Sequence, residues 1–478
     1  MTSSPAPDGA VRRSATLTIL GQGAKLVLLL VNLVVLGRLL TPEEFGIVTV
    51  AVAVVGVAEL LRDFGLSAAA IQAHSLSDDE QANLFWVSVA LGLALMSLVL
   101  AVAYPLEFLI GIEGLGSVTI GLAGVFLLNA LQTQFQARLT RAQRFGAVAA
   151  SDVGGQLVGF TVAVLLALAG AGAWSIVGLQ LCASAFVLSS RIALSRWNPG
   201  LYRRGVSIRR FLSFGLFLGL SQMLSYVVNS LPSLLIGRMA GAGPAGNFGR
   251  AWQVFSIPNN QIFSPLTNVV IVYLTAASRS SRYGSFSRVL VRVVGIFGAA
   301  AGSFLLCFSE DVVSLLLGSQ WQLASDFLEV LACSLPVQAL SVVYFWHFIC
   351  LDRTRSLLFY NLFSKGALVV GLVVSAWFSP IVLVTVLSIG WWLSWLVCGL
   401  WFRDEPLVSV RDMNFVGLGV CVLTFVPAVV LEFPVLEITQ GSDVLRVVLW
   451  GGIFAATLLL SGLWRPVVAL GVLRNKNI

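Results

Sequence analysis

Long apolar runs alternate with short polar stretches along the whole chain. A helix needs roughly 20 apolar residues to cross the hydrocarbon core, and these runs lack the alternation over about ten residues that is typical of barrel strands. A helix also satisfies its own backbone groups in lipid. The pattern predicts fourteen membrane helices, at residues 14–37, 45–70, 82–104, 117–137, 147–169, 174–195, 211–237, 246–276, 288–308, 325–350, 356–378, 381–402, 413–432 and 443–464.

The composition agrees with an all-α membrane protein. Of 478 residues, 58% are hydrophobic and 11% are charged, whereas soluble domains carry about 25% charged residues. The net charge of +7 lies mostly in the loops, so it indicates topology and anionic lipid headgroups, not a nucleic-acid partner. The six cysteines lie in apolar runs without a CxxC pair and predict buried side chains, with no metal site or disulfide framework.

Basic residues predict the orientation. If the N-terminus is cytoplasmic, 24 of the 29 Lys and Arg residues lie in cytoplasmic segments. The opposite loops are acidic and contain Glu107, Glu113, Glu310, Asp311, Glu432, Glu437 and Asp443. Cytoplasmic loops are enriched in Lys and Arg, so we expect both termini in the cytoplasm and an even number of helices.

A short pattern occurs twice, about 200 residues apart. Gly37-Arg38 is followed by Phe45-Gly46, and Gly237-Arg238 is followed by Phe248-Gly249. Six helices separate the copies, so both run in the same direction. This predicts two six-helix lobes in parallel repeat, at residues 1–200 and 201–405, with two further helices in 406–478. Two chance Gly-Arg pairs at helix ends are the alternative.

Parallel lobes favour a transporter. The sequence has no selectivity-filter pattern and no HExxH or Walker motif, and it contains two histidines, His74 and His347. We therefore expect no enzymatic activity, no ATP hydrolysis and no cofactor.

Four segments together resemble a known family. They are residues 37–46 (GRLLTPEEFG), 63–72 (DFGLSAAAIQ), 172–177 (GAWSIV) and 317–321 (LGSQW). Their order and spacing are similar to the polysaccharide transporter branch of the multidrug/oligosaccharidyl-lipid/polysaccharide exporter superfamily. That branch includes O-antigen and colanic-acid exporters and is related to the lipid II flippase.

The resemblance implies a flippase for an undecaprenyl-pyrophosphate-linked oligosaccharide in the bacterial inner membrane, used in polysaccharide biosynthesis. It implies two lobes around a central cavity, alternating access, and a polyprenyl tail that stays in lipid, along a groove of the last two helices. Membrane lipids and a polysaccharide polymerase or glycosyltransferases are the implied partners. Many relatives carry an Asp in helix 7, but residues 229–232 here read Asn-Ser-Leu-Pro, so the coupling ion stays open.

Charged residues inside the spans are the first site candidates, because a charge at mid-bilayer costs roughly 2.5–3.5 kcal/mol on insertion scales. Lys25 is expected to bind the pyrophosphate, or else to pair with Glu59 or Asp63. These two carboxylates, at i and i+4, share a helix face and could take up a coupling proton or balance Lys25. Arg38 and Arg238 could receive the emerging pyrophosphate, although capping helix carbonyls or binding headgroups is the favoured interpretation.

Further candidates lie in helices 7 and 8. Arg250 could line the cavity. Asn259 and Asn260 follow Pro258, where a kink frees backbone carbonyls and the amides could bond sugar hydroxyls; a kink held by neighbouring helices is the alternative. Gln222 and Asn229 are weaker candidates of the same kind. Asp152 is interpreted as a favourable charge near a helix N-terminus.

Three other functions remain open. A drug/cation antiporter of the same superfamily would favour acidic cavity residues, against which Lys25 and Arg250 argue. A membrane glycosyltransferase or polymerase would need catalytic carboxylates and a large outer loop, but the outer loops are short. A non-transporting scaffold of an export complex would tolerate neutral substitution of Lys25.

Overall fold

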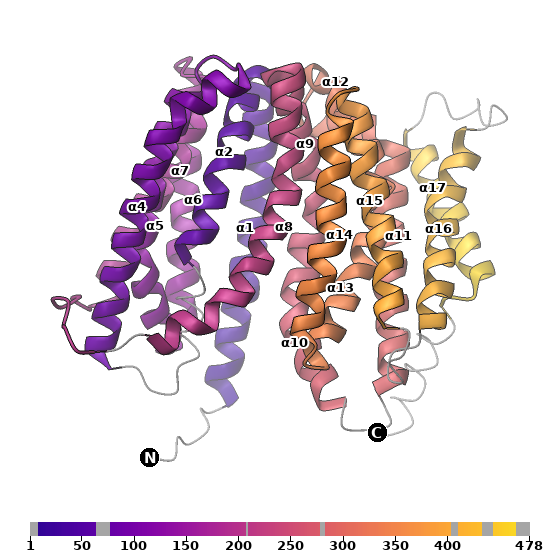
Figure 1. The fold of residues 1–478 in the computed structure, drawn as a ribbon. Coiled ribbons are helices and arrows are strands. Elements are labelled where there is room, and N and C mark those ends of the chain that lie inside the picture. Colours follow the sequence, from indigo (N-terminus) through magenta and orange to yellow (C-terminus); the bar gives the residue numbers. More distant parts are fainter. Residues whose placement is uncertain are drawn as a thin grey trace. The chain divides into compact units, whose positions relative to one another are not determined.

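A computed structural model describes residues 8–63, 77–206, 209–277, 283–402, 410–432 and 443–464, and within these ranges the regular structure is helical, with no strand (Figure 1). Nine helices in the described part are long and apolar enough to cross a membrane individually, or ten if one bent pair counts as a single span. The predicted all-α membrane architecture is confirmed.

The chain divides into two compact units, Met1–Gly246 with Leu316–Gln320, and Asn247–Leu315 with Trp321–Ile478. Unit 1 contains α1 (Asp8–Leu39), α2 (Pro42–Asp63), α4 (Asp78–Ile110), α5 (Leu115–Arg141), α6 (Phe145–Leu168), α7 (Trp174–Ser195) and α8 (Arg209–Ala240). Unit 2 contains most of α9 (Ala242–Pro258), then η1 (Asn259–Phe263), α10 (Ser264–Ala277), α11 (Tyr283–Leu316), α12 (Gln322–Ala332), α13 (Leu335–Cys350), α14 (Thr354–Ser375), α15 (Pro380–Trp401), α16 (Val410–Glu432) and α17 (Asp443–Ser461).

Each of the fourteen predicted helices has a counterpart, and two of them are interrupted. The helix predicted at 246–276 is α9, the π-helix η1 and α10 in succession. The helix predicted at 325–350 is α12 and α13, which meet at a bend of 49°. The end of the helix predicted at 45–70 lies outside the described residues.

The boundary between the units differs from the predicted lobe boundary at residue 200. Helix α8 packs along α2 inside unit 1. The Tyr226 hydroxyl donates a hydrogen bond of 2.9 Å to the Val52 carbonyl, and a Cβ at Gly56 would overlap that hydroxyl. The predicted lobes are defined by the sequence repeat, whereas the two units are defined by contacts within the structure. The units therefore do not test the three-part division of the chain, which stays a prediction.

The segment TPEEFG forms the start of α2. The Thr41 hydroxyl accepts from the Glu44 amide at 3.3 Å, and the Glu44 carboxylate accepts from the Thr41 amide at 2.9 Å. This reciprocal pair is a capping box, with Pro42 at the first helical position, where its missing N–H costs nothing. The motif therefore fixes the residue at which the second helix begins.

Two glycines let the starts of α2 and α9 touch through their backbones. A Cβ at Gly46 would overlap the carbonyl oxygen of Ala242, and a Cβ at Gly246 would overlap that of Pro42. Nearby, the Gln320 amide donates to the carbonyls of Gly37 at 2.9 Å and Leu40 at 3.1 Å. Side-chain donors of this kind help to satisfy the last carbonyls of a helix in lipid.

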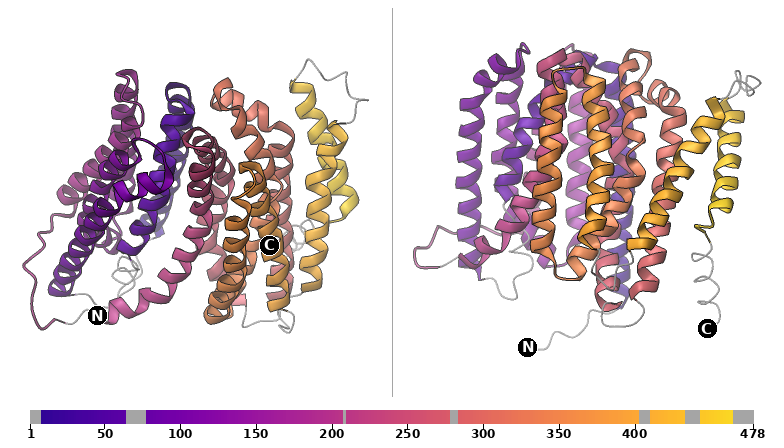
Figure 2. Two further views of the ribbon diagram at one scale, coloured as in Figure 1. Left: turned by 45° about the horizontal axis from the view of Figure 1, so that its top comes forward. Right: turned by 45° about the vertical axis from the view of Figure 1, so that its right-hand side comes forward.

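The core of unit 2 surrounds α13 and is rich in aromatic side chains. Trp346, Phe348 and Phe402 are buried, and the rings of Phe348 and Phe402 lie 4.6 Å apart. On the same helix, buried His347 contacts the Tyr283 hydroxyl at 2.6 Å and the Ser287 hydroxyl at 3.0 Å. Helices α14 and α15 run side by side in this unit (Figure 2).

Replacing Gly46 or Gly246 with alanine is expected to destabilise the protein by about 3 kcal/mol or more, because the new methyl group meets a backbone carbonyl that cannot rotate away. Thermal unfolding of the purified protein in detergent measures this. Gly23→Ala is the matched control, since a Cβ there meets nothing within 4 Å. Equal melting temperatures for all three variants would contradict the close crossing.

Candidate functional site

Three charged side chains meet inside unit 1. The Lys25 ammonium on α1 lies 2.6 Å from one carboxylate oxygen of Asp152 on α6. The Arg191 guanidinium on α7 lies 2.7 Å from the other oxygen. One carboxylate therefore serves two cations, and the triad carries one excess positive charge.

The contacts continue from Arg191 into α5. Its guanidinium donates to the side-chain oxygens of Gln132 at 2.8 Å and Gln136 at 3.0 Å. Gln132 donates to Asn129 at 2.7 Å, and Asn129 donates to Glu59 on α2 at 3.0 Å. Side chains from α1, α6, α7, α5 and α2 thus form one connected set, which we call the unit 1 polar network.

Small residues place the charged partners opposite each other. On α6, Gly155 and Gly159 face α7 so closely that a Cβ would lie 3.0 Å from the Ala183 carbonyl oxygen and 2.6 Å from that of Leu179, respectively. Small residues four apart let membrane helices approach to backbone contact. On the other side of α6, a Cβ at Gly21 would lie 3.0 Å from the Ala149 Cβ.

Lys25 follows Gly21 by four residues and Asp152 follows Ala149 by three, so each charged residue lies about one turn beyond its contact. The α1–α6 packing therefore presents Lys25 to Asp152. The position of the charge pair is a consequence of the small-residue contact next to it.

Exposure differs within the triad. The Arg191 side chain is 4% exposed, whereas Lys25 and Asp152 are 25% and 23% exposed. Arg191 is therefore enclosed among polar partners, and Lys25 is the more exposed cation of the triad.

The structure gives Lys25 a partner that the sequence did not suggest. Its partner is Asp152, and Glu59 joins the same network at its far end through Asn129. The side chains of Asp63 and Gln222 lie outside the described residues. The proposed coupling role of Glu59 and Asp63 stays a prediction.

The arginine candidates have distinct surroundings. Arg38 and Arg238 are exposed in the last turns of α1 and α8, where a cation interacts favourably with the helix dipole. Arg250 is 1% exposed; its guanidinium lies 5.5 Å from the Trp321 ring centroid and donates to Gln253 at 3.0 Å. Their contacts with substrate stay predictions.

The amide candidates lie near helix irregularities. Asn259 and Asn260 open the π-helix η1 directly after Pro258, and Asn260 is exposed. The proline-associated irregularity expected from the sequence is therefore present. Asn229 is exposed on α8, three residues before Pro232.

Sequence reasoning missed most of the polar network. Arg191 was counted only as a cytoplasmic basic residue, and Asp152 only as a charge near a helix start. A signal existed on α5: Asn129, Gln132 and Gln136 recur at i, i+3 and i+7 within an apolar run, which places three amides on one helix face.

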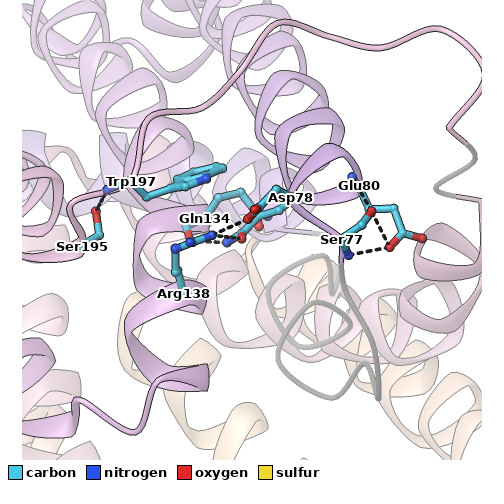
Figure 3. Close-up of polar contacts among 8 residues, drawn as sticks. Ser77, Asp78, Glu80, Gln134, Arg138, Ser195 and Trp197 are labelled. Atoms are coloured by element: carbon cyan, nitrogen blue, oxygen red, sulfur yellow. Dashed lines mark hydrogen bonds and ion pairs between the residues drawn. The ribbon is translucent and has the colours of Figure 1, made fainter.

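A second polar cluster closes one end of unit 1 (Figure 3). The Arg138 guanidinium bonds to Asp78 at 2.8 Å and to Gln81 at 3.0 Å, and it lies 5.6 Å from the Trp197 ring centroid. Ser77 and Glu80 form a capping box at the start of α4. These contacts tie α4, α5 and the segment after α7 together, which is an architectural role.

The side chains of the network do not form a metal-binding site. Among the described residues no three His, Cys, Asp or Glu side chains lie together in a way that could hold a metal ion. Its chemistry suits an anion at the Lys25 ammonium or proton uptake at its carboxylates, with the amides as hydrogen-bond partners.

Comparison with known proteins identifies the family. Residues 35–326 match the family described as "Polysaccharide biosynthesis protein". The chain belongs to this family. The matched stretch includes the polar network of unit 1 except Lys25, which precedes it.

Two relatives illustrate the family. The chain is 26% identical over 320 residues to the lipopolysaccharide biosynthesis protein WzxC of Escherichia coli K12, which covers 66% of this chain and 64% of the relative. It is 30% identical over 330 residues to the succinoglycan biosynthesis transport protein ExoT of Rhizobium meliloti, which covers 68% and 66%. The chain thus spans slightly less than two thirds of each relative's length.

Solved structures share the fold. The lipid II flippase MurJ in an inward closed conformation aligns with a TM-score of 0.72 and 10% identity, over 95% of this chain and 99% of MurJ. An inward-facing multidrug transporter of the MATE family aligns with a TM-score of 0.58 and 16% identity, over 80% and 94%. At these identities the likeness concerns the fold.

Asp152→Ala is expected to destabilise the protein by about 3 kcal/mol, because it leaves the buried Arg191 charge without its carboxylate. Lys25→Ala removes a more exposed cation and is expected to cost less than about 1 kcal/mol. Thermal unfolding of the two variants in the same detergent compares them. If Lys25→Ala is more destabilised than Asp152→Ala, the idea that Arg191 depends on the Asp152 carboxylate is wrong.

Proposed function

We propose that this chain is a flippase that carries an undecaprenyl-pyrophosphate-linked oligosaccharide across the bacterial inner membrane by alternating access, for polysaccharide biosynthesis. The observation that carries the proposal is a reachable cation, Lys25, on a membrane-spanning helix of a chain from a polysaccharide biosynthesis family. The fold shared with MurJ supports the same reading.

The charge balance of the triad favours an anionic ligand. Lys25 and Arg191 share the single carboxylate of Asp152, so an incoming phosphate oxygen can accept a hydrogen bond from the Lys25 ammonium while Asp152 stays paired with Arg191. A lysine binds phosphate as a compact, flexible point charge. The network thereby offers a positive site inside the span without leaving a buried carboxylate uncompensated.

The pair is also a point where binding and conformation can be coupled. Lys25–Asp152 links α1 to α6. A pyrophosphate that draws Lys25 away weakens this link, so the ligand binds more tightly to a conformation in which α1 has moved. A ligand shifts an equilibrium only through such differential affinity.

The network reaches a second carboxylate, Glu59, through Asn129 and Gln132. We propose this end as the place where a coupling cation or proton acts. Moving one positive charge across 100 mV supplies about 2.3 kcal/mol, which is comparable to the cost of breaking one charge-assisted contact.

The expected partners follow from the substrate. A lipid-linked oligosaccharide is made by glycosyltransferases on one side of the membrane and consumed by a polymerase on the other. With both termini in the cytoplasm, as the basic residues predict, loading occurs at the side where the N-terminus lies.

The test is a flipping assay in proteoliposomes with a fluorescent undecaprenyl-pyrophosphate oligosaccharide. Lys25→Ala is expected to lower the rate about 10- to 100-fold, since a hydrogen bond to a charged group contributes about 1.5–3 kcal/mol. Lys25→Arg should retain part of the activity because it keeps the charge.

Arg446→Ala is the control, because its partly exposed pair with Asp311 joins α17 to α11 in unit 2, outside the network. Full activity of Lys25→Ala would remove the anion-binding role of Lys25. Efflux of organic cations without any flipping of lipid-linked sugar would replace the proposal with the antiporter function.

A further inference from the structure

A hollow in the surface of unit 2 lies outside the polar network. It is a groove of about 650 Å³ lined by Phe359, Leu362, Phe363, Gly366, Ala367 and Trp401, from α14 and the end of α15. Its rings are strongly exposed, with Phe359 at 62% and Phe363 at 63%. Residues 355–375 of this helix are long and apolar enough to span a membrane, so an exposed apolar face there suits a hydrocarbon chain entering the open groove from the side.

The groove is bounded by fixed side chains. Trp401 lies at one wall with its ring 6.3 Å from that of Tyr360. Tyr360 is held in turn by a hydrogen bond of 3.0 Å from its hydroxyl to the Ser394 carbonyl and by stacking on Phe348 at 5.9 Å. The wall is thus attached to the aromatic core around α13.

The floor of the groove is formed by small residues. Gly366 and Ala367 lie between the larger side chains, and a Cβ added at Gly366 would meet nothing within 4 Å. The space at position 366 is therefore open, and a larger side chain there would project into the groove.

A cation lies in line with the groove. Arg355, Phe359, Leu362 and Gly366 follow one another at intervals of three or four residues, so they share one face of α14. Arg355 is exposed in the first turn. At this helix start Arg353 and Arg355 outnumber one carboxylate, Asp352, among the described residues.

The length of this face matches one leaflet. From Arg355 to Gly366 the helix rises by about 16 Å, roughly half of the hydrocarbon core. A lipid with its anionic head at Arg355 would thus place the first part of its chain along the rings and the small floor.

We propose that this groove binds the polyprenyl chain of a polyprenyl-phosphate lipid, with the phosphate at Arg355. The inference rests on the proposed function, which requires the substrate's tail to stay beside the protein while its head crosses. It differs from the sequence-based expectation, which placed the tail along the last two helices.

The shape favours an isoprenoid over a straight acyl chain. An isoprenoid carries regularly spaced methyl branches and flat double bonds. A branch can fill the hollow at Gly366, and the flat segments can lie on the rings of Phe359, Phe363 and Trp401, which maximises dispersion contacts.

The experiment uses the full chain in nanodiscs of zwitterionic lipid with a photoreactive polyprenyl phosphate that carries no sugar. Labelling is expected within residues 355–367 and at Trp401, and unlabelled polyprenyl phosphate should compete while phosphatidylglycerol should not. Gly366→Phe is expected to reduce labelling about tenfold, because each methylene that loses its burial weakens binding several-fold.

Gly452→Phe on α17 is the matched control. A Cβ at Gly452 also meets nothing within 4 Å and the residue is exposed, but it lies outside the groove, so labelling should stay at the wild-type level. Arg355→Gln tests the head end separately and should weaken labelling while leaving its position unchanged.

Labelling that survives Gly366→Phe, or that is lost with Gly452→Phe instead, overturns the groove. Equal competition by phosphatidylglycerol overturns the isoprenoid assignment. The two proposals fail separately: specific labelling of a protein that flips no lipid-linked sugar supports the groove and refutes the flippase. Flipping of lipid-linked sugar by the wild-type protein without labelling of the groove supports the flippase and refutes the groove.

Discussion

Helices in hydrocarbon gain little from hiding apolar surface, so their association depends on close packing and on polar contacts. Unit 1 achieves close packing through glycine at two places. One is the crossing of α2 with α9 at Gly46 and Gly246, and the other is the contact of α6 with α7 at Gly155 and Gly159. The second contact makes the buried charge possible. It lies next to the ion pair in which Asp152 meets Arg191 at 2.7 Å.

The sharing of Asp152 between two cations links stability to recognition. Arg191 is enclosed beside the carboxylate, whereas Lys25 is partly exposed. On the proposed mechanism, Lys25 exchanges the carboxylate for the ligand. A carboxylate with one dependent and one exchangeable partner lets an anion bind without leaving an unpaired charge in the span. On the proposed mechanism, the same exchange loosens α1 from α6, so binding of the pyrophosphate and movement of the helix are one event.

The spans were predictable because they depend on length and hydropathy, which are local properties. The break after Pro258, which the sequence predicts as a kink and the structure shows as a π-helix, is local as well. The partner of Lys25 was not, because Asp152 is 127 residues away in sequence and is brought near by the small residues Gly21 and Ala149. Spacing within adjacent helices suggested Glu59 or Asp63 instead, and nothing in the sequence measures how close α1 and α6 lie.

The two units treat polar groups in their helices differently. In unit 2, Arg250 lies against Trp321, and His347 is enclosed by Tyr283 and Ser287 in an aromatic core. A ligand that used Arg250 would first have to displace an indole ring and give up a cation–π contact, worth about 2 kcal/mol when desolvated. In unit 1, the cation that a ligand meets is already a quarter exposed. On the proposed function, the exposure of Lys25 therefore favours it over Arg250 for the pyrophosphate, and the exposed aromatic side chains of unit 2 suit a hydrocarbon tail.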